Sequence, residues 1–137
     1  MLKNEIVVVV KGLIKQNNKV LVIKRSSNDE VGAGTWEFVG GKIDFGEKLE
    51  EALQREIEEE TKLVVTVGQL LYATTFMTKS NRQVVLLTYL CHSVGTEVTL
   101  SHEHDDYQWC ETDQLHQYLN IEIMMELEKN NCLSYIK

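Results

Sequence analysis

Short runs of apolar residues, separated by polar turns, characterise the first third of the chain. Residues 6–10 and 19–24 are rich in valine and isoleucine, which predicts two strands. Asn17 and Asn18 lie between these runs, and asparagine favours tight turns, so we expect the two strands to pair as a hairpin. A third short strand is predicted at residues 35–39, directly before the glycine pair at 40–41.

The middle of the chain changes from a helical pattern to a strand pattern. Residues 49–63 are rich in Ala, Leu, Gln, Arg and Glu and contain no glycine, which predicts a helix. Valine, threonine and aromatic residues then predict strands at 63–67, 70–76 and 82–91, with the polar segment 78–81 as a hairpin turn. Two further short strands are expected at 97–100 and 107–110.

Helix signals return near the C-terminus. Thr112 and Asp113 are good capping residues for a helix that includes Leu115 and Leu119, and residues 121–129 predict a last helix. The chain contains no repeat, low-complexity tract or linker, so we expect residues 1–137 to form a single domain. The order of elements predicts an α/β (α+β) fold in which helices pack on a mixed sheet.

Composition and charge exclude several classes of function. The chain is 43% hydrophobic and 26% charged, as in ordinary globular proteins, and its net charge of −7 argues against polymeric nucleic acid or an anionic membrane as a partner. The longest apolar run is too short to span a membrane, and the first residues lack a signal-peptide pattern. Three cysteines without C-x-x-C spacing suit reduced thiols, so a cytoplasmic location is expected.

Negative charge is concentrated in the predicted helix. Residues 47–60 contain seven glutamates and two basic residues. On a helical wheel Glu56, Glu59 and Glu60 lie on the same side as the leucines, so three carboxylates are expected to point toward the body of the protein. Two interpretations remain open: the carboxylates are solvated beyond the sheet edge, or they bind a hard divalent cation, Mg²⁺ or Mn²⁺.

The spacing of residues around this helix resembles a known motif. Gly41, five residues, Glu47, seven residues and then the run Arg55-Glu56-Ile57-Glu58-Glu59-Glu60-Thr61-Lys62-Leu63 is similar to the box of the Nudix hydrolases (MutT-like), G-x5-E-x7-R-E-U-x-E-E-x-G-U. Lys62 departs from the pattern, since the family has glycine there. A lysine at this position is expected to cost about 1 kcal/mol in stability, without loss of the chemistry.

The resemblance implies a fold, a reaction and a cofactor. The Nudix fold is an α/β/α sandwich around a mixed sheet with a catalytic helix, and its members hydrolyse nucleoside diphosphates linked to another group with Mg²⁺ or Mn²⁺. Position by position, it implies that the metal is held by the Gly41 carbonyl and by glutamates, with Arg55 orienting the carboxylates. The implied metal-binding glutamates are Glu47, Glu56, Glu59 and Glu60. Residues 101–109 are similar to a later loop of the family and add Glu103 to this set. Either Glu56 or Glu103 is the general base.

Substrate residues are less specified. Arg25, Lys42, Phe76 and His104 are candidates for substrate binding, although His104 in a solvated loop, or a zinc site with His102, are alternatives. The expected reaction is a housekeeping or sanitising one, in which a (deoxy)nucleoside triphosphate gives the monophosphate and pyrophosphate. ADP-ribose, nucleotide sugars and dinucleoside polyphosphates are alternative substrates, and a non-catalytic nucleotide-binding module is the rival function. A homodimer is possible on the same resemblance.

Overall fold

The structure is a computed structural model that describes residues 3–28 and 32–136. Four strands come first along the described part of the chain, a helix and three more strands follow, and short helices come after the last strand. The elements are β1 Glu5–Gln16, β2 Lys19–Arg25, β3 Trp36–Glu37, β4 Val39–Lys42, α1 Leu49–Thr61, β5 Val65–Lys79, β6 Arg82–Ser93, β7 His104–Cys110, the 3-10 helix η1 Thr112–Gln117, α2 Ile121–Lys129 and the 3-10 helix η2 Cys132–Tyr135.

Within the described residues, seven strands form one mixed sheet whose main path is β3-β2-β1-β6-β5. β1 lies parallel to β6 along most of its length. On its other side β1 pairs first with β4 and then, at its end, with β2. β7 completes the sheet beside β2. The long strand β1 therefore joins the two parts of the sheet.

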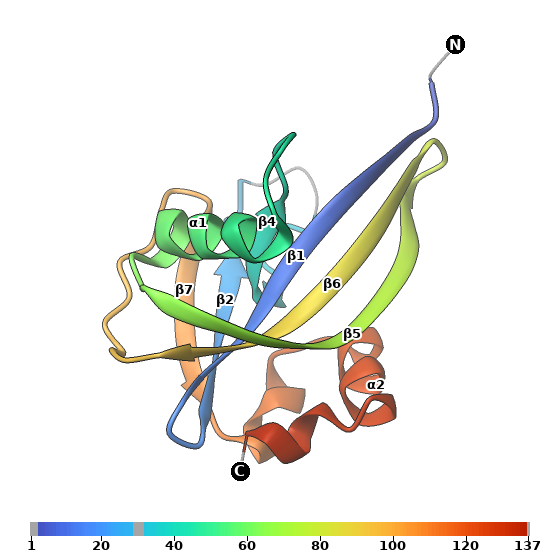
Figure 1. Ribbon diagram of the computed structural model, residues 1–137. Helices are drawn as coiled ribbons and strands as arrows, with labels where there is room; N and C mark the ends of the chain where they lie inside the picture. The colour runs from blue at the N-terminus through green and yellow to red at the C-terminus, as the bar shows by residue number, and fades with distance from the viewer. Residues whose placement is uncertain (1–2, 29–31, 137) are drawn as a thin grey trace.

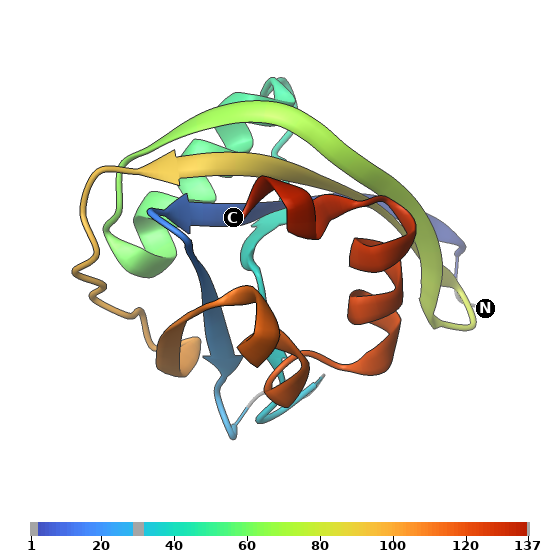
Figure 2. The same ribbon diagram turned by 90° about the horizontal axis from the view of Figure 1, so that it is seen from below.

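Helices cover both faces of this sheet. Figure 1 shows α1 on one face and α2 on the other, and Figure 2 shows the C-terminal helices gathered beneath the curved β5 and β6. α1 buries Leu53 and Ile57 in one core, whereas Leu115, Leu127 and Ile136 belong to a second core on the opposite face. The predicted α/β/α sandwich with a mixed sheet is confirmed. No helix of the described residues is both long enough and apolar enough to cross a membrane.

Several predicted elements agree closely with the structure. β1 and β2 form the expected hairpin, and Asn17 turns the chain with a positive φ of 59°. α1 begins at Leu49 as predicted and ends two residues before Leu63, and α2 has the predicted bounds. Lys62 follows α1 with a φ of 65°, in the left-handed conformation for which the family uses glycine.

Other predictions need correction. Residues 97–100 do not form a strand: the backbone N–H groups of Thr99 and Ser101 bond to carbonyls at the end of α1 instead of to a neighbouring strand. The strands predicted at 63–67 and 70–76 are parts of one strand, β5, which begins at Val65 and whose register shifts between Val67 and Leu70. The strand predicted at 35–39 is divided into β3 and β4. η1 is a short 3-10 helix capped by Glu111, not by Thr112 or Asp113.

Candidate active site

A cleft of about 1360 Å³ runs from α1 to the first turns of α2. One end carries four glutamates, which we call the acidic edge: Glu56, Glu59 and Glu60 from α1, and Glu103 from the segment before β7. The other end, which we call the α2 half, is lined mainly by aromatic and hydroxyl side chains of the sheet and by side chains of α2; these include Phe38, Tyr72, Thr74, Phe76, Ile123 and Glu126. The cleft can therefore hold a charged group and an apolar group together.

Gly41 has no side chain, so its backbone lies directly beside the acidic edge. A side chain at this position would begin 2.6 Å from Oε2 of Glu56, and at Gly40 it would overlap the backbone carbonyl of Val10. Glycine is needed at Gly40 because the β1 backbone approaches so closely, whereas a side chain at Gly41 would displace the Glu56 carboxylate. The Gly40–Gly41 pair of the sequence thus has a steric role, and it leaves the Gly41 backbone lining the cleft beside Glu56.

Arg55 holds the carboxylates of the helix and its preceding loop. Its Nε and Nη2 donate to the two oxygens of Glu47 at 2.7 and 2.9 Å, and its Nη1 lies 3.1 Å from Glu56 and 3.3 Å from Glu59. Hydrogen bonds from Arg55 and from the Asp44 backbone N–H lower the pKa of Glu47 to about 2. These contacts occupy both oxygens of Glu47, which holds Arg55 in place.

Glu60 is the most buried carboxylate of the acidic edge. It is 6% exposed, and its Oε2 has no hydrogen-bond partner among the described residues. Burial, with the nearby charges of Glu56, Glu37 and Glu103, raises the pKa of Glu60 to about 8, although Lys11 opposes this rise. Burial also raises the pKa of Glu56. A buried carboxylate with an unused oxygen is unfavourable unless a cation balances it, so this edge fits a divalent metal ion.

The helical wheel predicts that three carboxylates of α1 point toward the body of the protein. This is confirmed for Glu60 and partly met by half-buried Glu56, but it is wrong for Glu59. The side chain of Glu59 is 60% exposed and pairs with Arg55 of the preceding turn. Within residues 3–28 and 32–136, no three acidic, histidine or cysteine side chains form a ready-made metal cage. Glu56 and Glu59 instead point to Arg55, so the metal-binding set inferred from the sequence stays a prediction.

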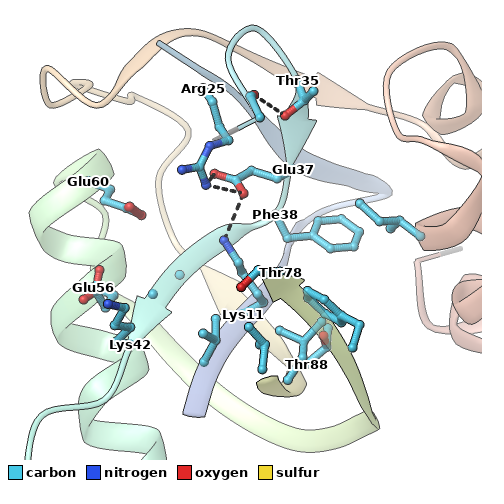
Figure 3. Close-up of a pocket in the computed structure, with 18 of the residues that line it drawn as sticks. Lys11, Arg25, Thr35, Glu37, Phe38, Lys42, Glu56, Glu60, Thr78 and Thr88 are labelled. Atoms are coloured by element: carbon cyan, nitrogen blue, oxygen red, sulfur yellow. Dashed lines mark hydrogen bonds and ion pairs between the residues drawn. The ribbon is translucent and has the colours of Figure 1, made fainter. Parts of the chain in front are cut away.

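A second charged group lies on the wall of the cleft, and we call it the Glu37 cluster: Glu37, Lys11, Arg25 and His104. The Glu37 carboxylate contacts Lys11 Nζ at 3.2 Å, Arg25 Nη1 at 3.3 Å and His104 Nε2 at 3.0 Å. Burial alone would raise the pKa of Glu37, but Lys11, His104 and Arg25 together lower it to about 2. Figure 3 shows Lys11 and Arg25 directed at this carboxylate, with Glu56 and Glu60 on the α1 side.

All four residues predicted to bind substrate line the cleft, but in different settings. Arg25 and His104 belong to the Glu37 cluster, Lys42 is exposed beside Gly41, and Phe76 is 46% exposed in the α2 half. The alternative of a solvated His104 is wrong, because the residue is 7% exposed. Its Nδ1 is buried without a partner among the described residues.

The sequence did not single out Lys11 or Glu37. Lys11 interrupts the apolar run of β1, and a charge in such a run is a signal that could have been read. Glu37 alternates with apolar neighbours like any strand residue, so its role emerges only when β1, β2 and β7 bring their side chains to it.

Comparison with known proteins gives concordant results. The family model described as NUDIX domain matches residues 3–127. The chain is 32% identical over 111 residues to a CTP pyrophosphohydrolase of Escherichia coli, covering 80% of this chain and 79% of that protein. It is also 32% identical over 120 residues to the nucleoside triphosphatase NudI of Escherichia fergusonii, covering 80% and 85%. A crystal structure of a MutT protein from Methanosarcina mazei has a TM-score of 0.83, with 26% identity and 96% of each chain covered.

Proposed function

Because the chain belongs to the Nudix hydrolase family, we propose that it is a Mg²⁺- or Mn²⁺-dependent pyrophosphohydrolase that converts a (deoxy)nucleoside triphosphate into the monophosphate and pyrophosphate. One observation carries the proposal: a single cleft joins the acidic edge, where Glu60 has an unused buried oxygen, to the apolar and hydroxyl-lined α2 half. Such a cleft suits a molecule with a phosphate chain at one end and a base at the other.

The acidic edge would hold the metal. Glu59 and Glu60 would be its principal ligands, with Glu56 as a further ligand or the general base, and Glu103 and the Gly41 carbonyl would complete the site. Glu47 acts from further out through Arg55, since its oxygens already accept three hydrogen bonds. When bound, the ion supplies charge neutralisation and polarisation of the phosphoanhydride.

The side chains of the protein then position the reactants. Either Glu56 or Glu103 accepts a proton from the attacking water, and burial raises the pKa of Glu56 in the direction that suits a base. Arg55 orients Glu56 and Glu59 through its ion pairs. Lys42 and Arg25 contact the phosphate chain.

Two side chains are assigned to the rest of the substrate. Phe76 offers an aromatic face in the α2 half, on which a base can stack. His104 lines the cleft and is held by Glu37, so we assign it to binding of the nucleotide.

The printed names of the relatives favour triphosphates over the other substrates of the family. The two relatives compared above are described as a CTP pyrophosphohydrolase and a nucleoside triphosphatase. A non-catalytic binding module would not need the box carboxylates, and Glu47, Glu56, Glu59 and Glu60 are all present.

The test is a product analysis across substrate classes. We expect pyrophosphate and a nucleoside monophosphate from at least one nucleoside triphosphate when Mg²⁺ or Mn²⁺ is supplied, and no product with a chelator. ADP-ribose, a nucleotide sugar and a dinucleoside tetraphosphate are assayed in parallel. Turnover of one of these and of no triphosphate would overturn the substrate assignment, and binding without turnover of any compound would favour the binding module.

A further inference from the structure

Lys11 is a cation placed in an otherwise apolar strand. In β1 it follows Val10 and pairs with Thr88 of β6, and both of these residues are fully buried. Its own side chain is 16% exposed. A lysine at such a position is costly unless negative groups compensate for its charge, and an apolar residue would fit the strand pattern better. The Lys11 ammonium group therefore needs negatively charged partners.

Glu37 provides only part of that compensation. Its carboxylate also accepts from Arg25 and contacts His104, so its negative charge is shared among three side chains. An ammonium group has three N–H donors. In the described part of the chain, one hydrogen bond, to Glu37 at 3.2 Å, is found for Lys11 Nζ. Glu37 thus holds the Lys11 ammonium group in position, and the remaining N–H donors of that ammonium group are available at the cleft wall.

The position of Lys11 selects the part of the nucleotide that it can reach. Lys11 lines the cleft together with the acidic edge and the α2 half, and its charge acts on Glu60. Figure 3 shows Lys11 with Glu56 and Glu60 on one side and Phe38 on the other. A nucleotide with its phosphate chain at the acidic edge and its base in the α2 half would place the nucleoside-linked phosphate between them.

We propose that Lys11 binds the phosphate group that stays on the nucleoside after cleavage, and this assignment rests on the proposed function. A fixed ammonium group donating to a phosphate oxygen forms a charge-assisted hydrogen bond, which is stronger than a neutral one. Glu37 is a positioning residue in this arrangement: it accepts from Lys11 and orients it, and the donors around it leave it poorly placed to contact the substrate itself.

The experiment measures binding of the product rather than turnover. Calorimetric affinities for the four common ribonucleoside monophosphates and for the matching nucleosides are compared among wild type, Lys11→Met, Lys11→Arg and the control Lys15→Met. Lys15 lies on the same strand but outside the cleft. We expect Lys11→Met to weaken binding of the monophosphate with the highest affinity by about tenfold or more, while the affinity for the matching nucleoside changes less than about twofold. Lys11→Arg should recover most of the loss, and Lys15→Met should match wild type.

Three results would overturn the assignment. Unchanged monophosphate affinity in Lys11→Met would show that Lys11 does not bind the phosphate. Equal weakening of nucleosides and monophosphates would show a loss of cleft structure instead, and absence of monophosphate binding in wild type would also count against it. Failure of the proposed function has a different signature: Lys11-dependent monophosphate binding in a protein that hydrolyses no triphosphate would leave Lys11 assigned and the reaction wrong.

Discussion

The Glu37 cluster makes a quantitative prediction about acid stability. Glu37 is mostly buried, and its pKa of about 2 in the folded protein compares with about 4.5 in an unfolded chain. The folded state therefore binds fewer protons than the unfolded state between these values, and ionised Glu37 stabilises the fold above pH 4.5. The difference corresponds to about 3 kcal/mol at neutral pH, which is lost as the pH falls from about 4.5 through 2.

The perturbation is Glu37→Gln, which keeps the shape of the side chain and removes its charge. Denaturant unfolding at pH 7 should give a free energy of unfolding lower by about 3 kcal/mol than that of wild type, and the gap should fall to less than half by about pH 3. The matched control is Glu5→Gln, because Glu5 pairs with Arg82 at 3.2 Å but is 55% exposed. That exposed pair should contribute less than about 1 kcal/mol.

The stability difference between wild type and Glu37→Gln must change with pH if Glu37 acts through its charge. A loss of equal size at pH 7 and pH 3 would mean that the substitution disturbs packing and not a charge interaction. A loss as small as that of the Glu5 control at pH 7 would mean that Lys11, Arg25 and His104 do not stabilise the ionised carboxylate.

Three further substitutions test the geometry around the acidic edge. Gly41→Ala places a methyl group against the Glu56 carboxylate, so kcat should fall at least about tenfold while the circular dichroism spectrum is retained. Arg55→Lys removes the two-point contact with Glu47; it should lower kcat about 10- to 100-fold with little change in Tm, and a normal kcat would contradict the orienting role. Lys62→Gly relieves a positive φ and should raise the free energy of unfolding by up to about 1 kcal/mol, which denaturant unfolding would detect; a decrease would mean that the lysine side chain has a stabilising contact.

Elements governed by local signals could be predicted from the sequence. α2 carries apolar residues at Ile121, Met124, Met125 and Leu127, and the β1–β2 hairpin has a turn that asparagine favours, so the sequence predicts the bounds of α2 and the place of the hairpin. The segment 97–100 has strand-forming residues, but tertiary hydrogen bonds to the end of α1 fix it as an irregular segment. Such bonds join residues far apart in the chain, and composition does not reveal them.

In the candidate site, too, local features could be predicted from the sequence and tertiary contacts could not. The glutamates of the box could be identified by their fixed spacing within one helix and its flanking loop. The 60% exposure of the Glu59 side chain depends on the tertiary surroundings of α1, and the pairing of Lys11 with Glu37 depends on the packing of separate strands. A periodicity argument gives the direction of a side chain but not the extent of the surface beneath it.

The most direct test of the central claim compares two glutamates of one helix. Glu60 lies in the acidic edge with a buried, unpartnered oxygen, whereas Glu58 is exposed outside the cleft. The measurement is kcat for pyrophosphate release from the best triphosphate with Mg²⁺, for wild type, Glu60→Gln and Glu58→Gln. The account predicts a loss of at least about a hundredfold for Glu60→Gln and an unchanged kcat for Glu58→Gln. Equal activity of the two variants would contradict it.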